Sequence, residues 1–203
     1  RQYPSATVVR RAYMGGVVDG AAQVGGIEVV DGAYKPFASR TWLDNLRAEP
    51  QRNGHVLLMR TLSKFGLAGV RLGYLLGPQA LVAEIDKVRP PYNVSVLNSE
   101  AALFALEHAD VFAAQAQELC AQRTALVAAL QAMEQVEKVW PSEANMVLLR
   151  VPDAARTQAA MKARGVLVKN VSALHPLLAN CLRLTVGSAE ENTQMLAVLQ
   201  ESL

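Results

Sequence analysis

The chain has 203 residues, of which 51% are apolar and 19% are charged, and its formal net charge is +2. This balance is typical of a globular protein and argues against disorder. Basic residues form no stripe of the kind that nucleic-acid binding requires, and no apolar run approaches the roughly 18 residues of a membrane span. The isolated Cys120 and Cys181 fit a reducing, cytosolic setting. We therefore expect no nucleic-acid partner, no membrane and no bound metal.

The front of the chain alternates predicted strands with connections. A short helix is predicted around residues 17–23, and Gly25-Gly26 ends it. Apolar, partly β-branched runs predict buried strands. These strands are expected at residues 27–30, 55–59 and 71–76, with a short helix at 42–47. The alternation indicates a parallel α/β sheet.

Helices dominate the rest of the sequence. Apolar spacing predicts helices at residues 79–88, 97–107, 111–135 and 154–164, and strands at 136–140, 146–151, 166–169 and 182–186. Ser188 and Glu191 form a capping-box pattern before a last helix at 189–201. The prolines at 90 and 91 end the first of these helices. We expect a domain over residues 1–90 and a smaller α+β domain, with a linking helix, over 91–203.

One lysine stands in a glycine-rich turn directly after the second predicted strand. Lys64 lies between the hydroxyl residues Thr61 and Ser63 and the arginine Arg71. Burial disfavours the ammonium form of a lysine and makes its amine a nucleophile toward an aldehyde. Hydroxyls and a guanidinium are suited to a phosphate. An aldehyde beside a phosphate describes pyridoxal 5'-phosphate, whereas the plainer interpretation is a strand, a turn and solvent-facing basic residues.

Two residues at the end of the first predicted strand complete this set. Asp31 offers a carboxylate that can keep a pyridine nitrogen protonated, and Tyr34 offers a hydroxyl for the ring oxygen. Ligand sites in open α/β sheets collect at the carboxyl ends of strands. Alone, Asp31 is more often a turn residue and Tyr34 a packed aromatic, but together with Lys64 they indicate a pyridoxal-phosphate site.

Several motifs resemble the fold-type I aminotransferases, and most closely their histidinol-phosphate aminotransferase branch. The stretch from Ser63 to Tyr74 is similar to the pyridoxal-lysine signature, and Val30-Asp31-Gly32-Ala33-Tyr34 is similar to Val-Asp-Glu-Ala-Tyr. Further similar segments are Arg89-Pro90-Pro91-Tyr92-Asn93-Val94, Ala144-Asn145-Met146-Val147 and Leu182-Arg183-Leu184-Thr185-Val186-Gly187. The resemblance implies a truncated fold-type I transferase, α/β in class. It comprises part of the pyridoxal-phosphate-binding large domain (1–90) and the small C-terminal domain (91–203).

The resemblance also implies roles for individual residues. Lys64 would bind the cofactor aldehyde, Asp31 the pyridine nitrogen and Tyr34 the ring oxygen, while Ser63, Thr61 and Arg71 would lie at the cofactor phosphate. Arg183 would bind the carboxylate of glutamate or the phosphate of histidinol phosphate, with Lys169 and Asn145 nearby. The implied reaction is histidinol-phosphate:2-oxoglutarate transamination by a cytoplasmic homodimer.

Two departures from the family pattern keep alternatives open. Gly32 stands where the family motif has glutamate, and Tyr3-Pro4-Ser5 resembles only a remnant of an Asn-Pro-x-x-Pro-Thr loop. The front portion of the family pattern, which supplies most strands of the large domain, is missing. The first alternative is another enzyme of the same fold, an aromatic or aspartate aminotransferase or a phosphothreonine decarboxylase. The second is an inactive fragment.

Overall fold

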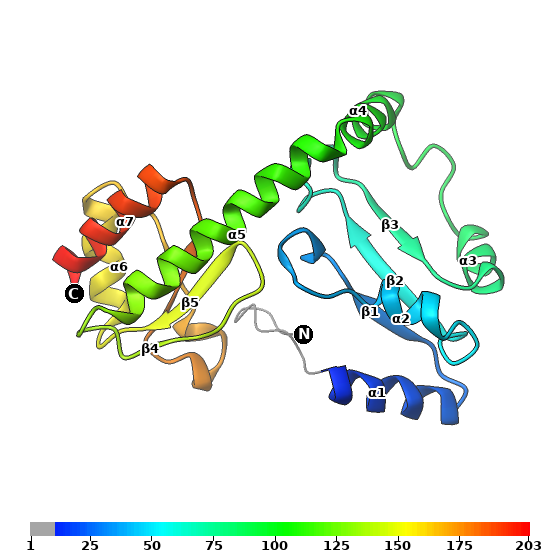
Figure 1. Cartoon of the computed structure of the whole chain (residues 1–203), viewed down its shortest axis with the longest axis horizontal. Helices are drawn as coiled ribbons and strands as arrows, with labels where there is room; N and C mark the ends of the chain where they lie inside the picture. Colours follow the sequence, from blue (N-terminus) through cyan, green and yellow to red (C-terminus); the bar gives the residue numbers. More distant parts are fainter. Residues whose placement is uncertain (1–10) are drawn as a thin grey trace. The chain divides into compact units, whose positions relative to one another are not determined.

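The computed structural model describes residues 11–203, so the segment Tyr3-Pro4-Ser5 lies outside the described residues. The described chain divides into two compact units, residues 11–116 and Gln117–Leu203 (Figure 1). The division falls inside the long helix α5, Ala109–Gln131. The two units have other bounds than the domains expected from the sequence. Those domains, 1–90 and 91–203, remain a prediction.

The first unit contains a three-stranded sheet in the order β1-β2-β3 (Figure 1). Strands β1 (Glu28–Asp31) and β2 (Val56–Thr61) are parallel, as the sequence predicts. Strand β3 (Gly73–Leu76) runs antiparallel to β2, so the expectation of a wholly parallel sheet is wrong there. The cause is the connection, because a parallel partner needs a crossover of a dozen or more residues that usually forms a helix. Residues 62–72 form only a compact turn.

Helix α1 (Arg11–Gln23) is longer than predicted, because its glycines interrupt the sequence pattern without ending the helix. It ends where expected: Gly25 has a φ of 68°, and the Gly26 amide donates to the Ala21 carbonyl. This left-handed stop is the arrangement that glycine favours. The other helices of this unit are α2 (Leu43–Ala48), α3 (Gln79–Asp86) and α4 (Val96–Glu107), together with the start of α5.

The second unit is a four-stranded antiparallel sheet in the order β4-β5-β7-β6. Its strands are β4 (Lys138–Val139), β5 (Met146–Arg150), β6 (Lys169–Asn170) and β7 (Cys181–Thr185). One face packs against α5, α6 (Ala154–Ala163) and α7 (Ala189–Ser202) through a continuous apolar core. The predicted capping box is present at α7: the Ser188 hydroxyl accepts from the Glu191 amide, and the Glu191 carboxylate accepts from the Ser188 amide.

The sheet of the first unit leaves apolar side chains open to solvent. Val29 is 51% exposed and Met59 is 45% exposed, and the register of β1 with β2 places both on one face. In the described part of the chain, β1 is an edge strand, paired on one side only. A sheet of only three strands has such an open edge and apolar face unless other elements cover them. None of the helices among residues 11–203 is both long and apolar enough to cross a membrane.

Candidate active site

The predicted cofactor residues of the first unit gather at the carboxyl ends of β1 and β2. Asp31 is the last residue of β1 and pairs in register with Met59, two residues before Thr61 ends β2. The Asp31 carboxylate accepts from the Ala33 amide at 2.9 Å, which turns the chain directly toward Tyr34. An aspartate that bonds two residues ahead is a common turn device. The turn therefore explains why Asp31 and Tyr34 emerge from the same strand end.

The lysine turn is held by hydrogen bonds at its base. The Thr61 hydroxyl accepts from the Ser63 amide at 3.0 Å and lies 3.4 Å from the Leu72 carbonyl, to which it donates. The Leu62 carbonyl accepts from two amides, those of Phe65 and Leu67. Thr61 thus closes the turn that carries Ser63 and Lys64, which is a structural use of a hydroxyl that the sequence assigns to the cofactor phosphate.

Packing on helix α5 fixes the far side of the same turn. The Phe65 ring stacks on Phe112 with centroids 4.8 Å apart. Gly66 has a φ of 119°, and a Cβ at that position would lie 2.7 Å from Phe112 Cδ1. Only glycine adopts this conformation readily and leaves room for the ring. The glycine-rich sequence therefore serves close packing as well as turn formation.

The structure brings Lys64 and Tyr34 together. The Lys64 ammonium nitrogen lies 5.0 Å from the centroid of the Tyr34 ring, within the range of a cation–π contact. Both side chains are half-buried, and they come from neighbouring strand ends. A nucleophilic amine and a phenol are thus adjacent at the place where the sequence predicts a cofactor ring.

Arg71 stands at the other end of the turn in a left-handed conformation. Its φ is 52°, and its guanidinium donates to the Ala68 carbonyl at 3.1 Å. The side chain is exposed, and none of the ion pairs found among residues 11–203 includes it. Arg71 and Ser63 therefore offer a cation and a hydroxyl that a phosphate can use.

The predicted substrate residues belong to the second unit. Lys169 of β6 pairs in register with Arg183 of β7, so the two basic side chains lie on the same face of the sheet. Like charges directly opposite each other repel, and an anion between them would relieve that repulsion. Asn145 precedes β5 and accepts from the Val186 amide through its backbone carbonyl. Arg183 and Lys169 are thus brought together, whereas Asn145 lies beside the far end of β7.

Sequence reasoning missed Arg60, a buried cation next to the site. Arg60 is 7% exposed in the middle strand of the first sheet. Its guanidinium donates to the Gly32 carbonyl at 3.2 Å and to the Thr41 hydroxyl. The signal was a charged residue two positions after the buried run Val56–Leu58, on the same face of the strand as Leu58. A charge in that position has to be paired or hydrogen-bonded within the fold.

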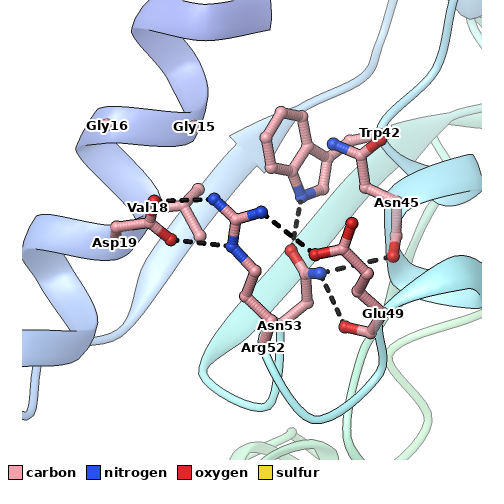
Figure 2. Close-up of a pocket in the computed structure, with 9 residues that line it drawn as sticks. All are labelled: Gly15, Gly16, Val18, Asp19, Trp42, Asn45, Glu49, Arg52 and Asn53. Atoms are coloured by element: carbon pink, nitrogen blue, oxygen red, sulfur yellow. Dashed lines mark hydrogen bonds and ion pairs between the residues drawn. The ribbon is translucent and has the colours of Figure 1, made fainter.

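A cavity of about 570 Å³ lies in the same unit, between α1 and the α2 region (Figure 2). None of the predicted site residues lines it. Arg52 crosses it to bind Asp19 and Glu49, and Asn53 uses its side-chain amide to join Trp42, Asn45 and Glu49 (Figure 2). These polar side chains already bind one another. They link α1 to the α2 region and leave no evident group for a ligand.

The comparisons with known proteins show the family to which the chain belongs. The family "Aminotransferase class I and II" matches residues 3–199, and the chain belongs to that family. The histidinol-phosphate aminotransferase of Acidovorax sp. (strain JS42) is 70% identical over 200 residues, which cover 98% of this chain and 54% of that protein. The chain thus spans about half the length of the curated relatives it matches.

Solved structures show the same fold. The histidinol-phosphate aminotransferase of Clostridium acetobutylicum superposes with a TM-score of 0.87 at 16% identity, over 98% of this chain and 60% of that one. The enzyme of Sinorhizobium meliloti, solved in complex with pyridoxal-5'-phosphate, has a TM-score of 0.75 at 24% identity, over 98% and 54%. These likenesses show that the chain has the fold-type I architecture over the 54 to 60% of those chains that it covers.

The donor set of the first unit fits pyridoxal phosphate. A ring-bound aldehyde needs an amine, the pyridine nitrogen a carboxylate and the phosphate several donors. Lys64 and Tyr34 are already in contact, and the side chains of Asp31, at the end of β1, and of Arg71 are exposed. The first unit therefore offers an amine, a phenol, a carboxylate and a cation at these strand ends.

Proposed function

We propose that this chain provides the cofactor lysine and the substrate arginine of a pyridoxal-phosphate-dependent histidinol-phosphate aminotransferase. The observation that carries the proposal is the contact of the Lys64 amine with the Tyr34 ring, 5.0 Å from its centroid, at the carboxyl ends of β1 and β2. The name of the relative with 70% identity supports this choice of substrate. Pyridoxal phosphate, when bound, supplies an electron sink for negative charge at the substrate Cα.

The residues of the first unit would bind and orient the cofactor. Asp31 would hold a proton at the pyridine nitrogen, because a nearby carboxylate favours the charged form of that nitrogen. Tyr34 would donate its hydroxyl to the ring oxygen. Ser63 and Arg71 would bind the phosphate, and Thr61 would keep the turn closed through its hydroxyl. Lys64 would hold the aldehyde and afterwards move a proton to and from the substrate Cα.

The residues of the second unit would bind the substrates. Arg183 would grip the carboxylate of glutamate or the phosphate of histidinol phosphate, since both are oxyanions that a guanidinium binds bidentately. Lys169, opposite Arg183 in the β6–β7 ladder, would add a second positive charge, and Asn145 would line the pocket. The net reaction passes the amino group of histidinol phosphate to 2-oxoglutarate. By its resemblance we assign the whole enzyme to the cytoplasm as a homodimer.

The first experiment asks whether Lys64 binds the cofactor. The purified 203-residue chain is mixed with pyridoxal phosphate, and we expect a visible absorbance band that borohydride fixes covalently onto Lys64, located by peptide mass spectrometry. Lys64→Ala should abolish the band and the fixed adduct. Lys162→Ala, at an exposed lysine of α6, is the matched control and should behave as the unaltered chain. A band that persists in Lys64→Ala contradicts the assignment.

A second measurement separates the enzyme classes. Glutamate added to the loaded chain should bleach the band as 2-oxoglutarate appears, and Arg183→Met should raise the glutamate concentration needed. Carbon dioxide release from a phosphorylated amino acid would instead identify a decarboxylase. A band without any reaction would identify a fragment that binds the cofactor but lacks activity.

A further inference from the structure

One buried guanidinium joins both ends of the segment that carries Tyr34. Arg60 donates to the carbonyl of Gly32, directly after Asp31, and to the hydroxyl of Thr41, two residues before α2 begins. The Thr41 hydroxyl also accepts from the Leu43 amide, which opens that helix. The segment of residues 32–41 is therefore hydrogen-bonded at both of its ends to the Arg60 side chain. Tyr34 lies inside this segment.

Arg60 supports the segment from the opposite face of the sheet. Asp31 pairs in register with Met59, and successive side chains along a strand point to opposite faces. Arg60 therefore lies on the face away from Asp31. The Gly32 amide donates to the Met59 carbonyl at 2.8 Å, which continues the ladder by one residue and places Gly32 beside Arg60.

Gly32 makes room for the arginine. A Cβ at Gly32 would lie 3.0 Å from Arg60 Nε and 3.0 Å from a methyl carbon of Leu58, tighter than ordinary van der Waals contact. Gly32 is not among the described glycines with a positive φ, so its backbone does not itself demand glycine. The absence of a side chain here serves the close approach of the guanidinium.

The hydrogen bonds of the Arg60 guanidinium go to two neutral acceptors, the Gly32 carbonyl and the Thr41 hydroxyl. No carboxylate lies within ion-pair distance among residues 11–203, and Arg60 Nε has no hydrogen-bond partner there. Burial lowers the pKa of the guanidinium, against an opposing influence of Tyr74 and Asp44. A buried cation without a counter-ion is costly to keep. Its two directed hydrogen bonds therefore indicate a role that an apolar residue would not fill.

From this geometry we infer that Arg60 is a positioning residue for the Lys64 site: by holding Gly32 and Thr41, it sets the place of the Tyr34 phenol relative to the Lys64 amine. The inference rests on the proposed function, because Tyr34 matters here as a ligand of the cofactor ring. Arg60 hydrogen-bonds Gly32 and Thr41 and acts on the Lys64 site through Tyr34.

The first test needs no cofactor. Arg40 is exposed and lies next to Thr41, so trypsin can cut the Arg40–Thr41 bond once the segment is released. In Arg60→Met we expect this cut, followed by mass spectrometry, to be roughly tenfold faster, since hydrogen bonds to charged groups are lost. Arg47→Met, at an exposed arginine of α2, is the matched control and should leave the rate unchanged. Unchanged cutting in Arg60→Met overturns the inference.

The second test asks whether Arg60 acts through Tyr34. Pyridoxal phosphate affinity is measured from the visible band in the unaltered chain, Arg60→Met, Tyr34→Phe and the double variant. We expect a roughly tenfold weaker affinity in Arg60→Met and less than about a twofold further loss when the change is added to Tyr34→Phe. A purely structural role would weaken binding equally in both backgrounds, and that result overturns the inference.

Two further variants keep the tests decisive. If Arg60→Met does not fold, Gly32→Ala displaces the guanidinium with Arg60 intact, and it should shift cutting and affinity in the same direction by a smaller factor. Arg60→Lys keeps the charge but cannot span both acceptors, so it should restore at most part of the loss. Full recovery of the cutting rate and the affinity in Arg60→Lys would contradict the contact of Arg60 with both Gly32 and Thr41. A chain without any band refutes the proposed function, and cutting at Arg40 then decides the inference alone.

Discussion

At the scale of single residues, the ion pair of Asp19 with Arg52 makes a measurable prediction. Hydrogen bonds from Arg52 hold the pKa of the Asp19 carboxyl below its usual value, and burial opposes them without reversing the shift. In Arg52→Met we expect the pKa of Asp19 to rise toward its ordinary value, because the hydrogen bonds that lower it are lost. An NMR pH titration of the carboxyl carbon measures it, with Arg47→Met as the control. An equally low pKa in Arg52→Met contradicts this cause.

The sign of the linked stability follows from that shift. A carboxyl whose pKa is lowered by folding stabilises the folded state above its unfolded-state pKa. This contribution is lost as the pH falls through the lowered value. Both side chains are about half exposed, so the effect is small and salt-screened. The pair therefore links α1 to the α2 region at every pH above the unfolded-state pKa of the Asp19 carboxyl, and the link weakens only in acid.

A residue could be predicted from the sequence where its partners lie close to it along the chain. It could not be predicted where its partners lie many residues away. Lys64, Ser63 and Arg71 are neighbours in one turn, and Asp31 and Tyr34 share one strand end, so short motifs contain them. The acceptors of Arg60 lie 28 and 19 residues away, at Gly32 and Thr41. No local pattern reports such a pairing. The roles of the predicted residues remain predictions until the cofactor experiments are done.

At the scale of elements, the lysine turn depends on one glycine more than on another. Gly66 combines a φ of 119° with a Cβ position 2.7 Å from the Phe112 ring, whereas nothing lies within 4 Å of a Cβ at Gly69. We expect Gly66→Ala to lower the free energy of unfolding by about 2 kcal/mol through strain and overpacking. Gly69→Ala, the matched control, should change it by less than about 0.5 kcal/mol.

The measurement is denaturant unfolding of the first unit. The chain has two tryptophans, and in a Trp140→Phe background the fluorescence of Trp42 reports on residues 11–116 alone. Equal losses in the two glycine variants would mean that the turn tolerates a Cβ at Gly66, contrary to the packing against Phe112.

Elements were predictable where local chemistry decides them. The α7 capping box and the glycine stop of α1 involve neighbouring residues, and both predictions are confirmed. The predicted direction of β3 was wrong, because the direction in which two strands pair depends on how the turn between them folds in space. The period of the apolar residues does not report it. Helix α1 was predicted too short, since the low helix propensity of its glycines is outweighed in the folded unit.

At the scale of the whole molecule, the two units differ in how much apolar surface they bury. The continuous core clusters consist of residues 119–203, all of them in the second unit. Most exposed large apolar side chains belong to the first unit, and they include Val24, Tyr92, Val96 and Leu97. Hydrophobic stabilisation scales with the apolar area removed from water. The second unit should therefore be the more stable of the two.

This difference predicts unfolding in two steps. We expect Trp42, watched in Trp140→Phe, to report a transition at lower denaturant concentration than Trp140, watched in Trp42→Phe. Each tryptophan lies in a different unit, so each signal follows one unit. Pyridoxal phosphate, if it binds the first unit, should move the Trp42 midpoint upward and leave the Trp140 midpoint in place, because a ligand stabilises only the state that binds it. Coincident transitions at both tryptophans would contradict the prediction and would mean that α5, which runs through both units, couples them into one cooperative body.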